Sequence, residues 1–158
     1  MKTYTPINIP RSTHYGINFY NTYSTKIKRK VAFYSQLEYH NFLTLEFNPS
    51  VINFCEQPLK IEIDVDGKRE SSIFDMWVLY ETGFEEFQEV KYQKELVDNL
   101  TSSRSIDQIE KQKLWCQSNG YLHSIRTEND IYLGPFYISN LKYNVKKSII
   151  DGREKYLI

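Results

Sequence analysis

The spacing of apolar and polar residues changes along the chain and predicts the order of its elements. From Ser35, the stretch "SQLEYHNFLTLEF" repeats apolar residues at helical spacing. Ser35 and Glu38 fit the S-x-x-E pattern of a capping box, which marks the start of a helix. The turn-forming "NPS" follows at 48–50. We therefore predict a first helix that begins near Ser35 and ends before residue 48.

Strand-like runs follow this helix. The runs are "VINFCEQ" (51–57), "LKIEIDV" (59–65), "SSIFDMWVLY" (71–80) and "FEEFQEVKY" (84–92). The "DG" between the second and third runs is a hairpin turn signal, and "ETG" separates the last two. This part of the chain therefore predicts a sheet of three or more strands.

Helical spacing returns after the strand-like runs. One helix is loosely indicated around 93–99. A clearer one lies in "SIDQIEKQKLWCQSNG", with Ser105 as its N-cap candidate and Gly120 just past its end. The stretch "YLHSIRT" is typical of a strand. The stretch "GPFYISNLKYNVKKSII" predicts a last helix with Pro135 in its first turn.

The order of these patterns predicts one α/β domain over residues 1–158, with a mixed central β-sheet flanked by helices. The length suits a single core. Residues 1–30 are polar and contain proline, which predicts an extended N-terminal arm with one short strand near Tyr15–Tyr20. Residues 128–158 predict a C-terminal tail helix and no separate second domain.

Charge and composition narrow the function classes. The 20 basic and 20 acidic residues give a formal net charge of zero, whereas an independently tight nucleic-acid binder is usually basic. A neutral protein that acts on DNA therefore implies a partner. Cys55 and Cys116 lie far apart and form no C-x-x-C pair, so no zinc set or disulfide framework is predicted. No apolar run has membrane-spanning length and the first residues show no secretory signal, so we expect a cytoplasmic protein with no membrane contact.

The candidate chemistry depends on how the strands around "ETG" pair. A three-residue loop at 81–83, with its glycine in the left-handed conformation, places Tyr80 opposite Phe84. In that register Asp75 lies directly opposite Glu89 on the same face of the sheet. A two-residue turn of the threonine and glycine shifts the register by one and puts the two acids on opposite faces. The sequence leaves both registers open.

In the three-residue register, two like charges face each other, which costs stability. Lys91, on the same face as Glu89, supplies one positive charge, and a divalent cation bound by Asp75 and Glu89 would supply two. Hard carboxylate ligands favour Mg²⁺ or Mn²⁺. Such an ion can activate water for phosphodiester hydrolysis, with Lys91 orienting or deprotonating the water or neutralising the phosphate. An ordinary surface hairpin with cross-strand charges is the alternative.

Further charged residues qualify as site candidates. Glu38 lies upstream of the strands, where an acidic group would come in over the sheet, although the capping box alone also explains it. A basic cluster precedes the first helix and consists of Lys26, Lys28, Arg29 and Lys30. This cluster is a candidate for contacts with DNA phosphates, and a solvated basic loop is an equal alternative.

The blocks "YSQLEYHNFLTLEFNPSVINFCEQP", "FDMWV", "EVKY" and "IEKQKLWCQSNG" resemble, in order and phrasing, the TnsA family of transposon endonucleases. That family belongs to the PD-(D/E)xK, restriction-endonuclease-like superfamily, so the resemblance implies a restriction-endonuclease-like core. It spans roughly Arg29 to Thr127. Glu-Gln-Pro at 56–58 matches a family motif, but no role is assigned to Gln57.

The resemblance implies roles for individual residues. Glu38 matches the helix acid, Asp75 the central metal-ligand aspartate, Glu89 the second ligand position and Lys91 the catalytic lysine. It also implies the backbone carbonyl of Val90 as a ligand, Glu38 as a further candidate ligand and two Mg²⁺ ions in each site, with Mn²⁺ able to substitute.

The sequence departs from the family pattern in two places. Phe74 precedes Asp75 where the superfamily usually has proline. Members often carry a second, C-terminal domain that contacts the transposition ATPase, whereas residues 128–158 here predict only a tail helix. Contact with an AAA+ transposition ATPase is therefore a weaker expectation than contact with DNA.

The resemblance implies a Mg²⁺-dependent DNA endonuclease subunit of a heteromeric transposase. Such a subunit cuts the non-transferred strand at the 5′ ends of the transposon, while a DDE-type transposase partner cuts and joins the 3′ ends. Two other functions stay open. One is a stand-alone PD-(D/E)xK nuclease, such as a phage junction-resolving or restriction-type enzyme. The other is a non-catalytic DNA-binding assembly subunit that keeps the nuclease fold.

Overall fold

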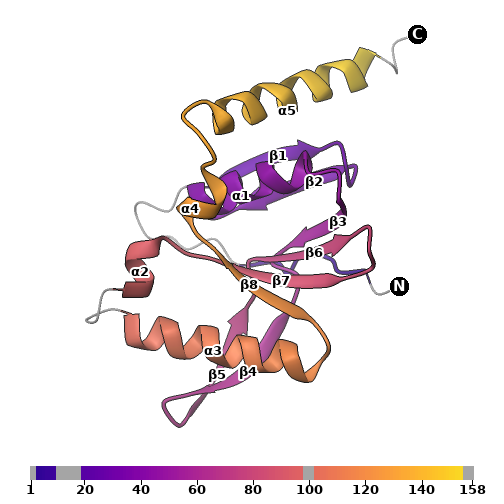
Figure 1. Ribbon diagram of the computed structural model, residues 1–158. Helices are drawn as coiled ribbons and strands as arrows, with labels where there is room; N and C mark the ends of the chain where they lie inside the picture. Colours follow the sequence, from indigo (N-terminus) through magenta and orange to yellow (C-terminus); the bar gives the residue numbers. More distant parts are fainter. Residues whose placement is uncertain (1–2, 10–18, 98–101, 155–158) are drawn as a thin grey trace.

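A four-stranded mixed sheet forms the centre of the computed structural model, which describes residues 3–9, 19–97 and 102–154 (Figure 1). Its strands, in spatial order, are β3 (Val51–Glu56), β6 (Met76–Tyr80), β7 (Glu85–Val90) and β8 (Leu122–Arg126). β6 pairs antiparallel with both β3 and β7, and β8 pairs with β7 in parallel. The predicted α/β class with a mixed central sheet is therefore confirmed.

Helices cover both faces of this sheet (Figure 1). One face packs on α1 (Gln36–Glu46), where Phe42 belongs to the same apolar cluster as Met76 and Val78. The other face packs on α3 (Ser102–Ser118), where Cys116 joins Trp77 and other buried residues in a second cluster. Because Val78 and Trp77 are consecutive in β6, they point to opposite faces. The predicted first helix and the helix in "SIDQIEKQKLWCQSNG" are both present.

A second, two-stranded sheet lies beside α3 and consists of β4 (Lys60–Val65) and β5 (Lys68–Ile73) (Figure 1). Asp66 and Gly67 join its strands with φ of 53° and 74°, as a type I′ hairpin turn requires. The "DG" turn prediction is therefore confirmed.

The predicted strand 71–80 is wrong as a single element. β5 ends at Ile73 and β6 begins at Met76, so the chain changes sheets at Phe74 and Asp75. Phe74 is fully buried, and its backbone amide donates to the carbonyl of Leu59 at 3.3 Å. The amide of Asp75 instead donates to the carbonyl of Gln88 in β7 at 3.2 Å. The run of apolar residues does not reveal that the backbone changes its pairing partner, from Leu59 just before β4 to β7, between Phe74 and Asp75.

The register between β6 and β7 is the three-residue one. The amide of Tyr80 donates to the carbonyl of Phe84 at 2.9 Å, and Gly83 has φ of 85°. The pairing continues through Leu79 with Glu85 as far as Met76 with Gln88. Extended by one residue, this register places Asp75 opposite Glu89, as the longer loop predicted.

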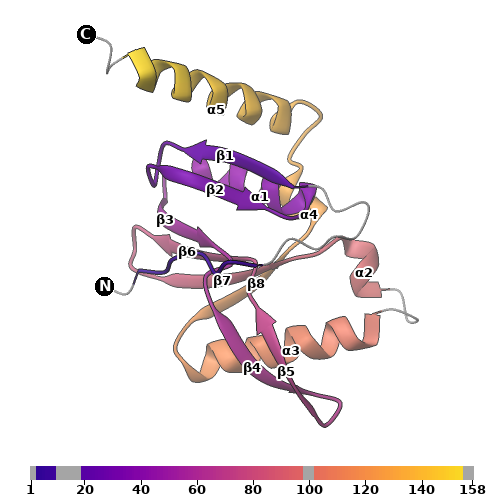
Figure 2. The same ribbon diagram turned by 180° about the vertical axis from the view of Figure 1, so that it is seen from behind.

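The N-terminal region contains a hairpin that the sequence did not predict. β1 (Tyr20–Ser24) and β2 (Arg29–Phe33) pair antiparallel and lie against α1 (Figure 2). Most of the expected short strand at Tyr15–Tyr20 falls outside the described residues. The buried carboxylate of Glu46 stabilises the hairpin turn, because it accepts from the amides of Thr25 and Lys26 at 2.8 and 3.1 Å. This contact comes from α1, so the local sequence does not reveal it.

Three more helices complete the described chain: α2 (Gln93–Val97), α4 (Glu128–Ile131) and α5 (Tyr137–Glu154). The last helix packs on α1, as Figures 1 and 2 show. Its predicted start is wrong, since the amide of Tyr137 bonds to the carbonyl of Gly134 and encloses Pro135 in a turn before the helix. The sequence analysis did not predict α4, although Thr127 and Asp130 form a capping box at its start. No helix in the described ranges is long and apolar enough to span a membrane.

The predicted N-cap of α3 is also wrong. α3 begins at Ser102, so Ser105 lies inside the helix. The guanidinium of Arg104 binds the carboxylate of Glu70 in β5 at 2.6 and 2.7 Å, which anchors this first turn to the neighbouring hairpin. At the other end, Gly120 has φ of 77° and follows the helix as predicted.

Candidate active site

Asp75 and Glu89 meet where β6 begins and β7 ends. The carboxylate of Asp75 accepts a hydrogen bond from the amide of Val90 at 2.7 Å. Its own amide binds the carbonyl of Gln88. The backbone of β7 therefore holds both the main chain and the side chain of Asp75 beside Glu89.

Glu89 is almost fully buried and has a different partner at each oxygen. Its Oε1 lies 3.3 Å from Nζ of Lys91, and its Oε2 accepts from Nε2 of Gln112 at 3.2 Å. The acid and base two residues apart thus form an ion pair, as the strand alternation predicts. The amide of Lys91 also donates to the carbonyl of Arg126 at 3.1 Å, which fixes the end of β7 against β8.

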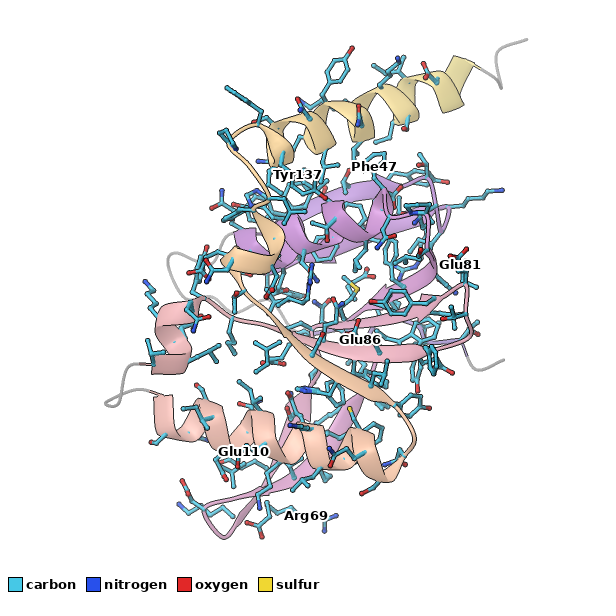
Figure 3. The ribbon with its side chains drawn as sticks, viewed as in Figure 1. Phe47, Arg69, Glu81, Glu86, Glu110 and Tyr137 are labelled. Atoms are coloured by element: carbon cyan, nitrogen blue, oxygen red, sulfur yellow. The ribbon has the colours of Figure 1, made fainter. Side chains whose placement is uncertain are left out.

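Glu86 belongs to the opposite face of the sheet. Its carboxylate accepts from the hydroxyl of Tyr80 at 2.6 Å and from the side-chain amide of Gln88 at 2.9 Å. Figure 3 shows Glu86 along β7. Glu86 and Glu89 are three positions apart, an odd spacing, so strand alternation turns the two carboxylates away from each other. Glu86 is therefore not part of the candidate site.

Glu38 approaches the site from the first turn of α1. Its backbone amide donates to the hydroxyl of Ser35 at 3.1 Å, which confirms Ser35 as the N-cap. The reciprocal bond of a capping box is not made, because the carboxylate of Glu38 faces the amide of Tyr34 and the side chain of Gln57, both at 3.4 Å. Against the effect of burial, which raises the pKa of Glu38, a hydrogen bond with the hydroxyl of Ser35 lowers it, so this carboxylate serves both the helix start and the cluster.

The three acids of this cluster carry more negative charge than Lys91 balances. Burial raises the pKa of Asp75 well above its usual range, and the nearby carboxylates of Glu89 and Glu38 raise that pKa further. Burial likewise raises the pKa of Glu38 and of Glu89. Burial lowers the pKa of Lys91, but Glu89 and Asp75 outweigh this and raise it overall. An added cation would relieve the repulsion among the acids.

The donor chemistry of the cluster fits a hard divalent cation. Asp75 and Glu89 offer carboxylate oxygens, and the carbonyl of Val90 is an oxygen donor of the kind that Mg²⁺ and Mn²⁺ prefer. Within the described residues, no group of three or more histidine, cysteine, aspartate or glutamate side chains lies together as a formed metal site. Each oxygen of Glu89 has one partner, Lys91 or Gln112, and keeps a further lone pair that a metal ion can use.

Gln57 connects the helix acid to the central aspartate. It is buried, and its φ of 39° is unusual for a residue other than glycine. Its backbone amide donates to the carbonyl of Asp75 at 3.1 Å, and its side chain approaches Glu38. Its carbonyl accepts from the amide of Ile7, which ties the N-terminal segment to the end of β3. The sequence assigned no role to Gln57.

Gln112 is the residue near the site that sequence reasoning missed. It is fully buried on the side of α3 that faces the sheet, between Ile109 and Cys116 at helical spacing. A glutamine on an otherwise apolar helical stripe was the available signal. Its partners lie on β5, β7 and β8, so their identity could not be read from the helix alone.

A comparison with protein-family models matches residues 48–128, slightly more than half of the chain, to the TnsA-like endonuclease N-terminal domain. The chain belongs to the TnsA-like endonuclease family. No curated protein matches it. The matched range holds Asp75, Glu89 and Lys91, and Glu38 lies upstream of it. The resemblance to this family and the restriction-endonuclease-like core are therefore confirmed.

In this TnsA-like chain, the basic cluster divides into two pairs. Nζ of Lys26 donates to three carbonyls at and beyond the C-terminal end of α1, those of Leu45, Asn48 and Val51, at 2.9, 2.5 and 2.7 Å. Arg29 forms a two-pronged ion pair with the buried Glu56 at 2.8 and 2.7 Å. Lys28 and Lys30 are exposed. Of the four candidate DNA-binding residues, Lys26 and Arg29 thus make contacts within the fold.

Proposed function

We propose that this TnsA-like protein is a Mg²⁺-dependent DNA endonuclease that hydrolyses the non-transferred strand at the 5′ ends of a transposon. Membership of the endonuclease family supports the reaction class. The observation that carries the proposal is the meeting of Asp75, Glu89 and Lys91 at one end of the sheet. These residues have the chemistry that metal-assisted phosphodiester hydrolysis requires.

Asp75 and Glu89 would hold the ion together with the carbonyl of Val90. When bound, the ion activates water and stabilises the charge that develops on the phosphate. Asp75 is already oriented by the amide of Val90, so little reorganisation is required of it. Glu38 is the candidate ligand for a second ion, because its carboxylate is half-buried near Glu89 and Lys91.

Lys91 would serve as a cationic hydrogen-bond donor. Its ammonium lies beside Glu89 and within the field of Asp75, and both carboxylates favour its charged form. A charged lysine cannot accept a proton from water. It can orient the attacking water or stabilise an oxygen of the phosphate.

The distribution of charge supports a partner-dependent enzyme. The net charge is zero, and Lys26 and Arg29 are committed to contacts within the fold. Few cations of the basic cluster are left to bind phosphates, and affinity for DNA depends largely on such contacts. We therefore propose that a DDE-type transposase places the protein on the transposon ends, with an AAA+ ATPase as a further candidate partner.

The test is strand cleavage by the Asp75→Ala variant on an end-labelled transposon-end duplex, with transposase and Mg²⁺. We expect cleavage of the 5′ strand to disappear while the circular dichroism spectrum stays that of the wild type. Asp64→Ala is the matched control, because Asp64 is exposed on β4 and should leave cleavage intact. Full cleavage by Asp75→Ala would sink the proposal.

Two other outcomes would favour the alternative functions. Cleavage of four-way junctions by the purified protein without a transposase would indicate a stand-alone nuclease. Failure to bind Mn²⁺ in calorimetry, with DNA present, would indicate a non-catalytic assembly subunit.

A further inference from the structure

A buried network of neutral side chains surrounds one oxygen of Glu89. Gln112 on α3 donates through Nε2 to the hydroxyl of Ser72 at 2.8 Å and to Oε2 of Glu89 at 3.2 Å. Its Oε1 lies 3.4 Å from Nε2 of His123 on β8. A primary amide has two hydrogens to donate, so Ser72 and Glu89 use its full donor capacity.

The chemistry of the partners fixes the orientation of this amide. An ionised Glu89 carboxylate can only accept hydrogen bonds, so the atom of Gln112 that faces it must be the nitrogen. The amide oxygen then faces His123 and can only accept, which assigns the hydrogen to Nε2 of His123. Because burial lowers the pKa of His123, the imidazole is neutral at physiological pH. Each group in the network therefore has a compatible partner.

We infer that Gln112 is a positioning residue that holds the Glu89 carboxylate in the active site, an inference that rests on the proposed endonuclease function. Glu89 is held from two sides, by the ammonium of Lys91 at Oε1 and by the amide of Gln112 at Oε2. A neutral donor orients a carboxylate and leaves its negative charge available to a cation. A second lysine or an arginine at this place would neutralise the ligand.

The surroundings of Gln112 argue against a role in packing alone. It lies between Ile109 and Cys116 on the apolar side of α3, where an apolar residue would avoid the cost of burying an amide. Gln108, one turn earlier, donates to the same Ser72 hydroxyl at 2.9 Å, so its amide is directed to Ser72 and not to Glu89. Gln108 thus provides a matched comparison: it shares the anchor and lacks the contact with the site.

The test compares Gln112→Met with Gln108→Met. Methionine keeps the length of glutamine and removes the amide. We expect crystals of Gln112→Met without metal to show the Glu89 carboxylate displaced or in several rotamers, whereas Gln108→Met keeps it in place. In calorimetry, Gln112→Met should bind Mn²⁺ about tenfold more weakly and cleave DNA more slowly, with an unchanged KM for DNA. Gln108→Met should match the wild type in both respects.

Each remaining outcome is decisive. An unmoved Glu89 and wild-type Mn²⁺ affinity in Gln112→Met would overturn the inference. Should Gln112→Met fail to fold, Gln112→Asn keeps the amide, withdraws it from Glu89, and must show the same displacement. A wild type that neither binds Mn²⁺ nor cuts DNA would refute the proposed function instead, and the position of Glu89 in the metal-free crystals would still decide the role of Gln112.

Discussion

At the scale of single residues, the site concentrates like charges that the fold does not neutralise. Asp75, Glu89 and Glu38 influence one another, and Lys91 is the cation placed among them in the described chain. Buried like charges reduce stability, and active sites commonly sacrifice stability for function. The cluster should therefore weaken the fold in the absence of a cation.

Asp75→Asn should make the metal-free protein more stable at neutral pH. Asparagine keeps an oxygen that accepts from the amide of Val90 and removes one charge from the cluster. We expect a gain of about 1 kcal/mol in the free energy of unfolding, or roughly 3 °C in melting temperature. Denaturant and thermal unfolding in chelator measure both quantities.

Mg²⁺ supplies the control for this effect. Titration with Mg²⁺ should raise the melting temperature of the wild type and leave that of Asp75→Asn nearly unchanged, because a ligand stabilises only the form that binds it. Asp64→Asn, on the exposed side of β4, should behave as the wild type throughout. A metal-free Asp75→Asn that melts below the wild type would show that the cluster does not destabilise the fold.

At the scale of elements, the three-residue loop between β6 and β7 fits the register in which Asp75 and Glu89 meet. Gly83 has φ of 85°, a conformation that residues with a Cβ rarely adopt. A Cβ built on Gly83 meets nothing within 4 Å, so the cost of a substitution comes from backbone strain. The residues of β6 from Met76 to Leu79 and those of β7 from Phe87 to Val90 are all buried, so a shift of register would require both faces of the sheet to repack.

Gly83→Ala should therefore lower stability and spare the chemistry. We expect a loss of about 1–2 kcal/mol in the free energy of unfolding, with wild-type cleavage per folded molecule. Gly134→Ala is the control, since Gly134 lies in open space and outside the left-handed region. Loss of cleavage in a folded Gly83→Ala would mean that the loop, rather than the buried strand faces, sets the register.

Much at this scale could be predicted from the sequence. Ser35 marked the start of α1, and the "DG" pair marked the turn between β4 and β5. The "ETG" loop left two registers open, and the structure has the one with a three-residue loop. What could not be predicted depends on contacts between distant segments. The split at Phe74 and the β1–β2 hairpin arise because carbonyls and a carboxylate elsewhere in the chain take up their backbone amides.

The same distinction applies to the candidate site. Asp75, Glu89 and Lys91 were placed together by strand alternation and loop length, both of which are local. Gln112 and Gln57 acquire their importance only through partners brought near by the tertiary fold. Glutamine carries no charge and occurs in many structural roles, so its residue type alone does not indicate a site.

At the scale of the whole molecule, neighbouring lysines of the basic cluster have different surroundings. Lys26 serves the fold by binding three carbonyls, whereas Lys28, two residues on, is exposed. Net charge alone cannot separate these two roles. The neighbouring lysines therefore offer a paired experiment.

Lys26→Met should lower the free energy of unfolding by about 1–3 kcal/mol, because buried carbonyls lose a charged donor. Lys28→Met should leave stability unchanged. If Lys28 contacts a phosphate, its loss should weaken DNA binding with partner present and reduce the salt dependence of affinity by roughly one unit of slope. Denaturant unfolding and binding isotherms at several salt concentrations separate the two effects. Equal stability loss in both variants would contradict this division.

Gln112 follows β6 and β7 in the sequence, and this order has a consequence for folding during synthesis. On the ribosome, β6 and β7 emerge first and can form a hairpin on their own, since short-range pairing closes rapidly. The acids then face each other before α3 has been synthesised. Glu89 gains the hydrogen bond from Gln112 only when α3 docks on the sheet. Under the proposed function, a nascent chain is thus expected to gain full DNA cleavage only after α3 has left the exit tunnel and docked.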